Sequence, residues 1–106
     1  MTDLLLRLSR LLAERKGADP GASYVAGLYA GGTDRILRKI GEESAEVILA
    51  GKSDDDAALA HEIADLWFHT LVLLAHRSMG AEQVLEELER RFGRSGLDEK
   101  AARLRE

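Results

Sequence analysis

The chain has 106 residues, of which 45% are apolar and 32% charged, and its formal net charge is −4. This length predicts a single domain over residues 1–106, and this apolar content excludes an intrinsically disordered chain. The lack of cysteine excludes disulfides and thiolate metal sites, while the acidic balance argues against a dedicated nucleic-acid binder.

The first predicted element is an amphipathic helix from Thr2 or Asp3 to about Lys16, with leucines at positions 4, 5, 8, 11 and 12. Charged residues interrupt its apolar run, so we do not expect a signal peptide. Gly17–Pro20 predicts a break. Ser23–Gly32 carries several glycines, which weaken a long helix, and predicts a loop with a short turn of helix.

The next predicted helix covers about 33–51 and is capped by Thr33 or Asp34. Its apolar stripe, formed by residues 36, 40 and 47, contains Glu43, and Glu46 lies beside it. A carboxylate turned toward a core is costly unless it is paired or bound to a metal ion. The pattern therefore predicts a partner for Glu43.

A second long helix is predicted from Asp55 to about Met79, with Ser53 or Asp54 as its cap. The acidic run 54–56 lies where the helix dipole favours negative charge. Apolar residues point almost all round the axis from 66 to 74, which predicts burial on more than one side and hence a homodimer. The longest apolar stretch, 63–75, is too short for a membrane span, so we expect a cytoplasmic protein.

Two shorter elements complete the prediction. Gly80 ends the second long helix or caps the next one, Ala81–Phe92. Gly93–Gly96 predicts a break, and Asp98–Arg105 predicts a short charged helix or an ordered tail. The fold class is therefore all-α, with four to five helices per chain in a bundle that homodimerisation completes.

The two long helices also predict a candidate metal site. Glu62, Asp65 and His69 share one helical face, and Glu43 and Glu46 share another. If the helices form an antiparallel hairpin, Glu43 and Glu62 each lie roughly 12 Å from the turn at about 1.5 Å per residue. Such a cluster of carboxylate oxygens suits Mg²⁺ or Mn²⁺.

Basic residues beside the acidic ones suggest phosphate chemistry. Lys39 lies between Glu43 and Glu46 on the helical wheel, and Arg35 and Lys52 are near in sequence, so these cations can bind phosphates. A plain ion pair between Lys39 and Glu43 is an equal alternative. His69, one turn from Asp65, either orients that carboxylate or is a satisfied interior histidine.

These motifs resemble a known family. The pattern Glu42-Glu43-x-x-Glu46 followed by Glu62-x-x-Asp65 is similar to the signature of the MazG-like all-α nucleoside triphosphate pyrophosphohydrolases. The stretches GTDRILRKIGEE (32–43), EIADLWFH (62–69) and SGLDEKAAR (95–103) resemble the phosphoribosyl-ATP pyrophosphatase family within that superfamily.

The resemblance implies Mg²⁺-dependent hydrolysis of phosphoribosyl-ATP to phosphoribosyl-AMP and pyrophosphate, the second step of histidine biosynthesis. It also implies a dimeric helical bundle. The family's domain is often fused to a cyclohydrolase, but this chain has no room for one and no cysteines for its zinc, so we expect the free-standing form. The family's metal-binding carboxylates map onto Glu42, Glu43, Glu46, Glu62 and Asp65. Within this reading, Glu42 or Glu46 is the candidate general base.

Two other hypotheses remain open on the sequence. A housecleaning pyrophosphohydrolase would apply the same chemistry to noncanonical nucleoside triphosphates. A non-catalytic dimeric helical adaptor would bind no Mg²⁺ and would tolerate apolar replacements at Glu43.

Overall fold

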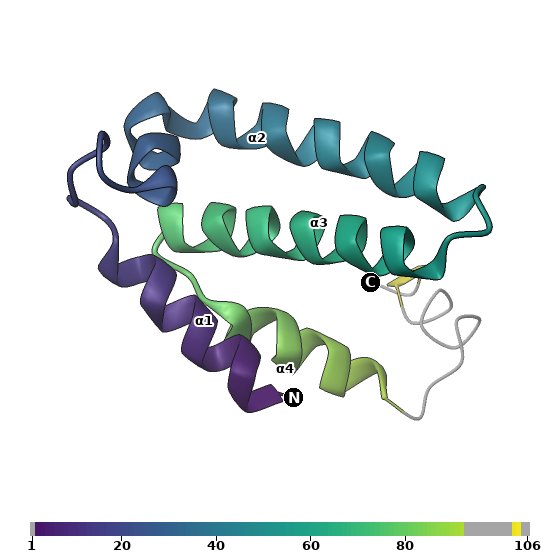
Figure 1. Ribbon diagram of the computed structural model, residues 1–106. Helices are drawn as coiled ribbons and strands as arrows, with labels where there is room; N and C mark the ends of the chain where they lie inside the picture. Colours follow the sequence, from purple (N-terminus) through teal and green to yellow (C-terminus); the bar gives the residue numbers. More distant parts are fainter. Residues whose placement is uncertain (1, 93–102, 105–106) are drawn as a thin grey trace.

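The computed structural model describes residues 2–92 and 103–104. Over this part of the chain it is a bundle of four α-helices without strands, which confirms the predicted all-α fold (Figure 1). The helices are α1 (Thr2–Glu14), α2 (Tyr24–Gly51), α3 (Asp56–His76) and α4 (Ala81–Arg91). The predicted break at Gly93–Gly96 lies outside the described residues, as does most of the predicted helix or tail Asp98–Arg105, of which 103–104 have helical backbone.

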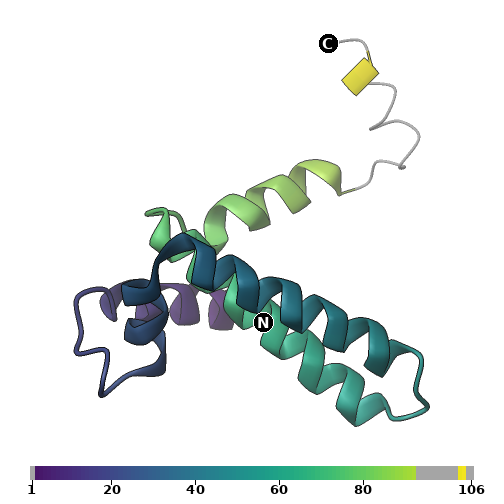
Figure 2. The same ribbon diagram turned by 90° about the horizontal axis from the view of Figure 1, so that it is seen from above.

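The centre of the structure is the predicted antiparallel hairpin, in which α2 and α3 lie side by side (Figure 1, Figure 2). The cap of α3 is Asp55, whose Oδ1 accepts a hydrogen bond from the N–H of Ala58 at 3.0 Å. The predicted caps Ser53 and Asp54 are therefore one or two residues early. Ser53 instead stabilises the turn, because its hydroxyl donates to the Ala50 carbonyl at 2.7 Å and accepts from the Asp55 N–H at 3.2 Å.

Residues 24–31 are helical, so the prediction of a loop with only a short turn of helix over Ser23–Gly32 is wrong. Ser23 caps α2 by accepting a hydrogen bond from the N–H of Ala26, and Val25, Ala26 and Leu28 are buried. Burial of these apolar side chains outweighs the weak helix propensity of the glycines. Gly32 then breaks the helix with φ +82° and ψ −178°, so α2 consists of two segments that meet at a kink.

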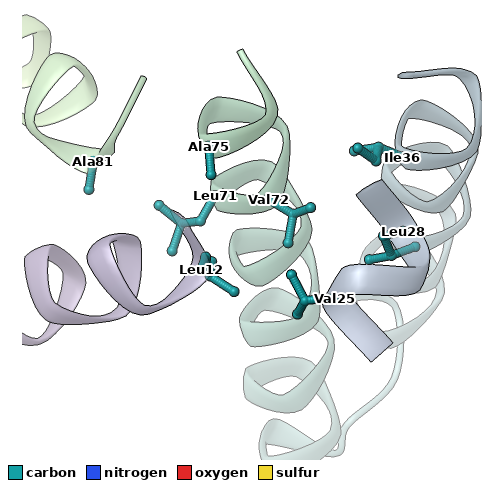
Figure 3. Close-up of a cluster of buried hydrophobic side chains, with 8 residues drawn as sticks. All are labelled: Leu12, Val25, Leu28, Ile36, Leu71, Val72, Ala75 and Ala81. Carbon is teal, nitrogen blue, oxygen red and sulfur yellow. The ribbon is translucent and has the colours of Figure 1, made fainter. Parts of the chain in front are cut away.

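The apolar core lies at the end of the hairpin that is remote from the 52–55 turn (Figure 3). The buried residues of α2 are at or before Ile36, and those of α3 are at or after His69. Leu28, Ile36 and Val72 are completely inaccessible to solvent. Each such side chain contributes about 1.5–3 kcal/mol on burial. The half of the hairpin near the turn has no comparable core among the described residues.

Helices α1 and α4 pack at the core end of the hairpin. The Ser9 hydroxyl on α1 accepts a hydrogen bond from the N–H of Ala81 at 2.9 Å, and both residues are buried. Helix α3 ends at His76, three residues before the predicted Met79, because Ser78 takes a positive φ of 60°. Gly80 is the N-cap of α4, one of the two roles predicted for it.

An apolar groove of about 480 Å³ lies between α1, α3 and α4. It is lined by Leu5, Trp67, Thr70, Leu71, Leu73, Leu74, Ala81, Val84, Leu85 and Leu88. Trp67 remains 57% exposed and Leu88 55% exposed. Helices α1, α3 and α4 therefore leave the apolar side chains of this groove partly open to solvent. By length and composition α3 also passes as a membrane span, a property it shares with core helices of soluble proteins.

The kink at Gly32 leads to a stability prediction. Gly32→Ala will lower the free energy of unfolding by about 1–3 kcal/mol, because a side chain is strained at this φ and ψ although the site has open space. Gly41→Ala is the matched control: Gly41 is exposed in the same helix and lacks a positive φ, so alanine will stabilise by about 0.8–1 kcal/mol. Urea denaturation at one fixed protein concentration measures both. Equal effects of the two substitutions would contradict the strained kink.

Candidate functional site

Three potential metal ligands gather on one face of α3. His61, Glu62 and Asp65 each offer a ligand atom, and these atoms all lie within 4.8 Å of one another. His61 Nε2 is 3.4 Å from Asp65 Oδ2. The imidazole is exposed, whereas Glu62 and Asp65 are half-buried. Carboxylate oxygens with one imidazole nitrogen are a donor set that divalent cations accept.

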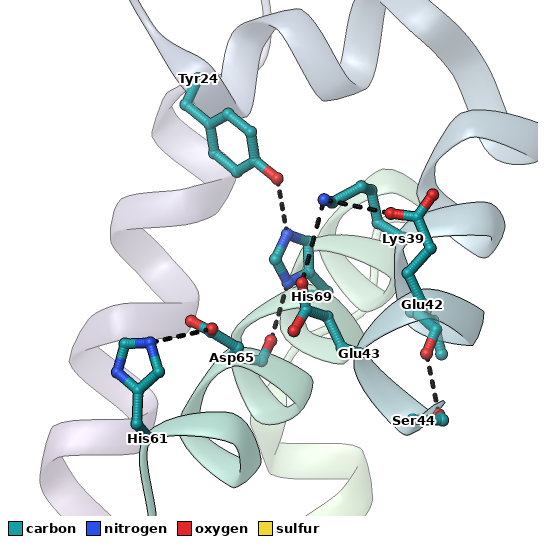
Figure 4. A network of polar contacts seen from close by, with 9 residues as sticks. Tyr24, Lys39, Glu42, Glu43, Ser44, His61, Asp65 and His69 are labelled. Atoms are coloured by element: carbon teal, nitrogen blue, oxygen red, sulfur yellow. Dashed lines mark hydrogen bonds and ion pairs between the residues drawn. The ribbon is translucent and has the colours of Figure 1, made fainter. Parts of the chain in front are cut away.

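Glu43 lies across the hairpin on α2 and is turned inward. Its side chain is only 13% exposed, and Lys39 Nζ is 3.9 Å from its carboxylate and 3.4 Å from that of Glu42 (Figure 4). The ammonium group therefore offsets part of the cost of burying the Glu43 charge. The predicted ion pair between Lys39 and Glu43 is present, and Glu42 shares it.

The other residues predicted for the site lie around this centre at different depths. Glu42 and Glu46 are exposed on α2. Arg35 is also exposed, and its side chain folds back over Gly31, where a Cβ would collide with it. Lys52 caps the C-terminal end of α2. Thirteen residues separate it from Lys39, which is about 20 Å along the helix axis, so the structure does not bring these two cations together.

His69 is buried and uses both ring nitrogens. Its Nδ1 lies 2.7 Å from the backbone carbonyl oxygen of Asp65, and its Nε2 lies 2.7 Å from the hydroxyl of Tyr24 (Figure 4). Only 5% of the residue is exposed. The interpretation as a satisfied interior histidine is therefore the better one, and the contact to Asp65 is with its backbone.

The electrostatics keep Lys39 cationic. The negative charge of an ionised Tyr24, followed by the carboxylate of Glu42, raises the pKa of Lys39 above its usual value, while partial burial opposes the rise. A lysine whose pKa is raised remains protonated at neutral pH. Lys39 can therefore bind an anion such as a phosphate group as a permanent point charge.

The half-buried carboxylates of α3 fit a divalent cation. Among the described residues, Asp65 is paired with His61, but no lysine or arginine lies within ion-pair distance of Glu62 or Asp65. Partly buried carboxylates without a cationic partner repel one another and lose hydration. A divalent ion would relieve both costs, so Glu62 and Asp65 are the residues best placed to hold one, with Glu43 opposite.

Two members of this site were missed in the sequence. His61 is one helical turn before Asp65, so its spacing was a usable signal. Tyr24 gave no local signal, because 45 residues separate it from His69 and only the tertiary structure joins them. Of the predicted carboxylates, Glu43 is turned inward on α2, and Glu62 and Asp65 are half-buried on α3. The α2 carboxylates, Glu43 included, are not part of the cluster that His61, Glu62 and Asp65 form.

Comparison with known proteins adds independent evidence. A family model described as Phosphoribosyl-ATP pyrophosphohydrolase matches residues 5–92, a segment that contains all the acidic residues above. A phosphoribosyl-ATP pyrophosphatase of Nitrosospira multiformis is 57% identical over 101 residues, covering 95% of this chain and 84% of that protein. The protein of the same name in Vesicomyosocius okutanii is 54% identical over 103 residues, covering 97% and 98%. A third, in Neisseria gonorrhoeae, is 52% identical over 100 residues.

The donor set predicts that divalent cations stabilise the folded chain. Mg²⁺ or Mn²⁺ at 100 times its dissociation constant will add about 2.7 kcal/mol to the free energy of unfolding. Asp65→Asn will remove most of this increment. Asp54→Asn removes the same charge from the exposed run near the turn and will leave the increment intact. Thermal unfolding with and without the cation measures the effect, and an increment that survives Asp65→Asn would place the ion elsewhere.

Proposed function

The chain belongs to the phosphoribosyl-ATP pyrophosphohydrolase family, and we propose that it hydrolyses phosphoribosyl-ATP to phosphoribosyl-AMP and pyrophosphate, the second step of histidine biosynthesis. The observation that carries this proposal is a set of inward-turned or half-buried carboxylates on α2 and α3, namely Glu43, Glu62 and Asp65. Cationic Lys39 lies beside Glu43. Family membership supplies the substrate. The geometry supplies groups suited to a charged phosphoanhydride.

We propose that Glu43, Glu46, Glu62 and Asp65 hold Mg²⁺, with Glu42 at the edge of the site and Mn²⁺ as a substitute. When bound, such an ion neutralises charge on phosphate oxygens and makes a water molecule more acidic. Half-burial of Glu43, Glu62 and Asp65 supports this assignment, because a less hydrated carboxylate gains more from a cation.

The protein's own groups then account for the hydrolysis. One exposed carboxylate of α2, Glu42 or Glu46, takes a proton from the attacking water as general base. The water oxygen bonds to the α-phosphorus, and the bond from that phosphorus to the α–β bridging oxygen breaks, which releases pyrophosphate. Lys39 and Arg35 bind phosphate oxygens and so hold the leaving group in place. Lys52 as a third phosphate ligand stays a prediction, given its distance along α2.

We also propose that the protein works as a homodimer in the cytoplasm. The apolar groove and the exposed Trp67 and Leu88 support a second copy as its cover, because monomers rarely leave such a continuous apolar face in water. On α3 this apolar face lies opposite the acidic face. Trp67 follows Asp65 by two residues, and two residues turn an α-helix by about 200°. Dimerisation would therefore bury one side of α3 and leave the other for substrate.

Activity is the direct test. Purified protein will release pyrophosphate from phosphoribosyl-ATP only when Mg²⁺ is present. Glu43→Gln and Glu62→Gln will each lower kcat/KM by about 100-fold or more, because each removes a charge that the ion and the reacting phosphates need. Glu87→Gln, on α4 and paired with Arg90 and Arg91, will keep full activity.

Two results would contradict the proposed hydrolysis of phosphoribosyl-ATP at this site. Full activity of Glu43→Gln and Glu62→Gln would remove the acidic site from the reaction. Preference for free noncanonical nucleoside triphosphates over phosphoribosyl-ATP would favour a housecleaning enzyme with the same chemistry.

The dimer has its own test on α4. Leu88→Lys places a charge in the apolar groove and will shift the mass measured by light scattering from dimer to monomer. Glu86→Gln changes the net charge by the same amount on the opposite face of the same helix and will remain dimeric. A wild-type protein that is monomeric at micromolar concentration would overturn the proposal.

A further inference from the structure

The acidic face of α3 includes one nitrogen donor. His61, Glu62 and Asp65 occupy positions i, i+1 and i+4 of the helix, and their ligand atoms all lie within 4.8 Å of one another. Side chains at i and i+4 are neighbours on a helix surface, so both ends of this short segment can reach one ion. The two histidines of an H-E-x-x-H helix, which bind a single zinc ion, have the same spacing.

The imidazole of His61 is accessible to a metal ion. Its side chain is 71% exposed, and its Nε2 lies 3.4 Å from Asp65 Oδ2 (Figure 4). A neutral imidazole offers one ring nitrogen to a metal ion, and here that nitrogen already lies beside a carboxylate oxygen. An ion that binds both atoms therefore requires only small side-chain movements.

The chain has three histidines, and the other two cannot supply a nitrogen at this face. His69 is buried, and both of its ring nitrogens already have hydrogen-bond partners at 2.7 Å. His76 follows His61 by fifteen residues, which is about 22 Å along the helix axis, and its ring stacks on Tyr29 with centroids 5.9 Å apart. A histidine ligand on the acidic face of α3 is therefore His61.

An ordinary surface ion pair is the alternative role for His61. In that role the imidazole competes with a cation for Asp65, so its removal would raise the affinity for every divalent cation to a similar extent. Removal of a ligand has the opposite effect, because the ion loses a bond. The two roles therefore predict changes of opposite sign in cation affinity.

The two cations proposed for this protein differ in how they accept nitrogen. Mg²⁺ takes oxygen ligands at near-ideal octahedral geometry and keeps several of its water molecules. Imidazole nitrogen instead favours first-row transition metals, a series to which Mn²⁺ belongs. A nitrogen ligand added to carboxylates therefore shifts the preference of a site from Mg²⁺ toward Mn²⁺.

We propose that His61 is a metal ligand together with Glu62 and Asp65, and that it makes this site bind Mn²⁺ more tightly than Mg²⁺. The inference rests on the proposed metal site and adds to it a residue that determines which cation is preferred. Three ligands on one helix leave other positions of an octahedral ion for further carboxylates, water and phosphate oxygens.

The first test detects the nitrogen directly. Pulsed electron paramagnetic resonance of untagged protein with bound Mn²⁺ and no substrate reports whether a nitrogen nucleus is coordinated to the ion. We expect nitrogen coupling in the wild type, its loss in His61→Gln and its retention in the matched control His76→Gln. Bound Mn²⁺ without nitrogen coupling in the wild type would overturn the proposal, as would a coupling that survives His61→Gln.

The second test measures the preference by calorimetric titration with Mn²⁺ and with Mg²⁺. The wild type will bind Mn²⁺ roughly tenfold more tightly than Mg²⁺. His61→Gln will weaken Mn²⁺ binding roughly tenfold and change Mg²⁺ binding less than about threefold, because glutamine replaces the nitrogen with an amide oxygen. His76→Gln will keep both dissociation constants. Tighter binding of both cations by His61→Gln, or an equal change for both, would make His61 an ion-pair partner only and overturn the proposal.

Failure of the proposed function can be told apart from failure of this inference, because neither measurement uses the substrate. If the wild type does not hydrolyse phosphoribosyl-ATP but binds Mn²⁺ through the His61 nitrogen, the function fails and the inference stands. If hydrolysis is normal and bound Mn²⁺ shows no nitrogen coupling, only the inference fails.

Discussion

Carboxylates held between two helices must be neutralised, and this constraint shapes the hairpin of α2 and α3. Glu43 on α2 is turned inward and is paired with Lys39. On α3, Glu62 and Asp65 are half-buried, and among the described residues Asp65 is paired with His61. Carboxylates that lie close together become more favourable when a cation binds them. Such an arrangement is expected at a binding site, because functional residues there are often placed where they do not favour stability.

Stability and chemistry are divided along the length of the hairpin. The completely buried side chains cluster where α1 and the first segment of α2 cover α3, and the acidic groups lie in the half that extends toward the 52–55 turn. The core end fixes the spacing of the two helices, so the acidic end needs no apolar core of its own. The kink at Gly32 connects the two halves, because it both completes the core and returns Tyr24 to the site.

The two faces of helix α3 differ in chemistry. One face carries Glu62, Asp65 and His69, and the opposite face carries Trp67, Leu71 and Leu74 of the groove. This division explains why the helix is apolar enough to pass as a membrane span and yet contains the ligands of a candidate metal site. A second copy on the apolar face would leave the acidic face open, so binding and assembly would not compete for the same surface.

The sequence by itself determined the all-α class, the long hairpin, the inward position of Glu43 and the family, because each depends on helical periodicity or on motifs within one segment. It failed at Ser23–Gly32, where burial of Val25 and Leu28 overrides glycine-rich propensity, and it left the partner of His69 open. Only the tertiary structure decided that Tyr24 meets His69 and that Lys52 lies far along α2 from Lys39. The physical reason is that helical patterns record neighbours three or four residues away, whereas these contacts and separations depend on a kink and on packing between distant segments.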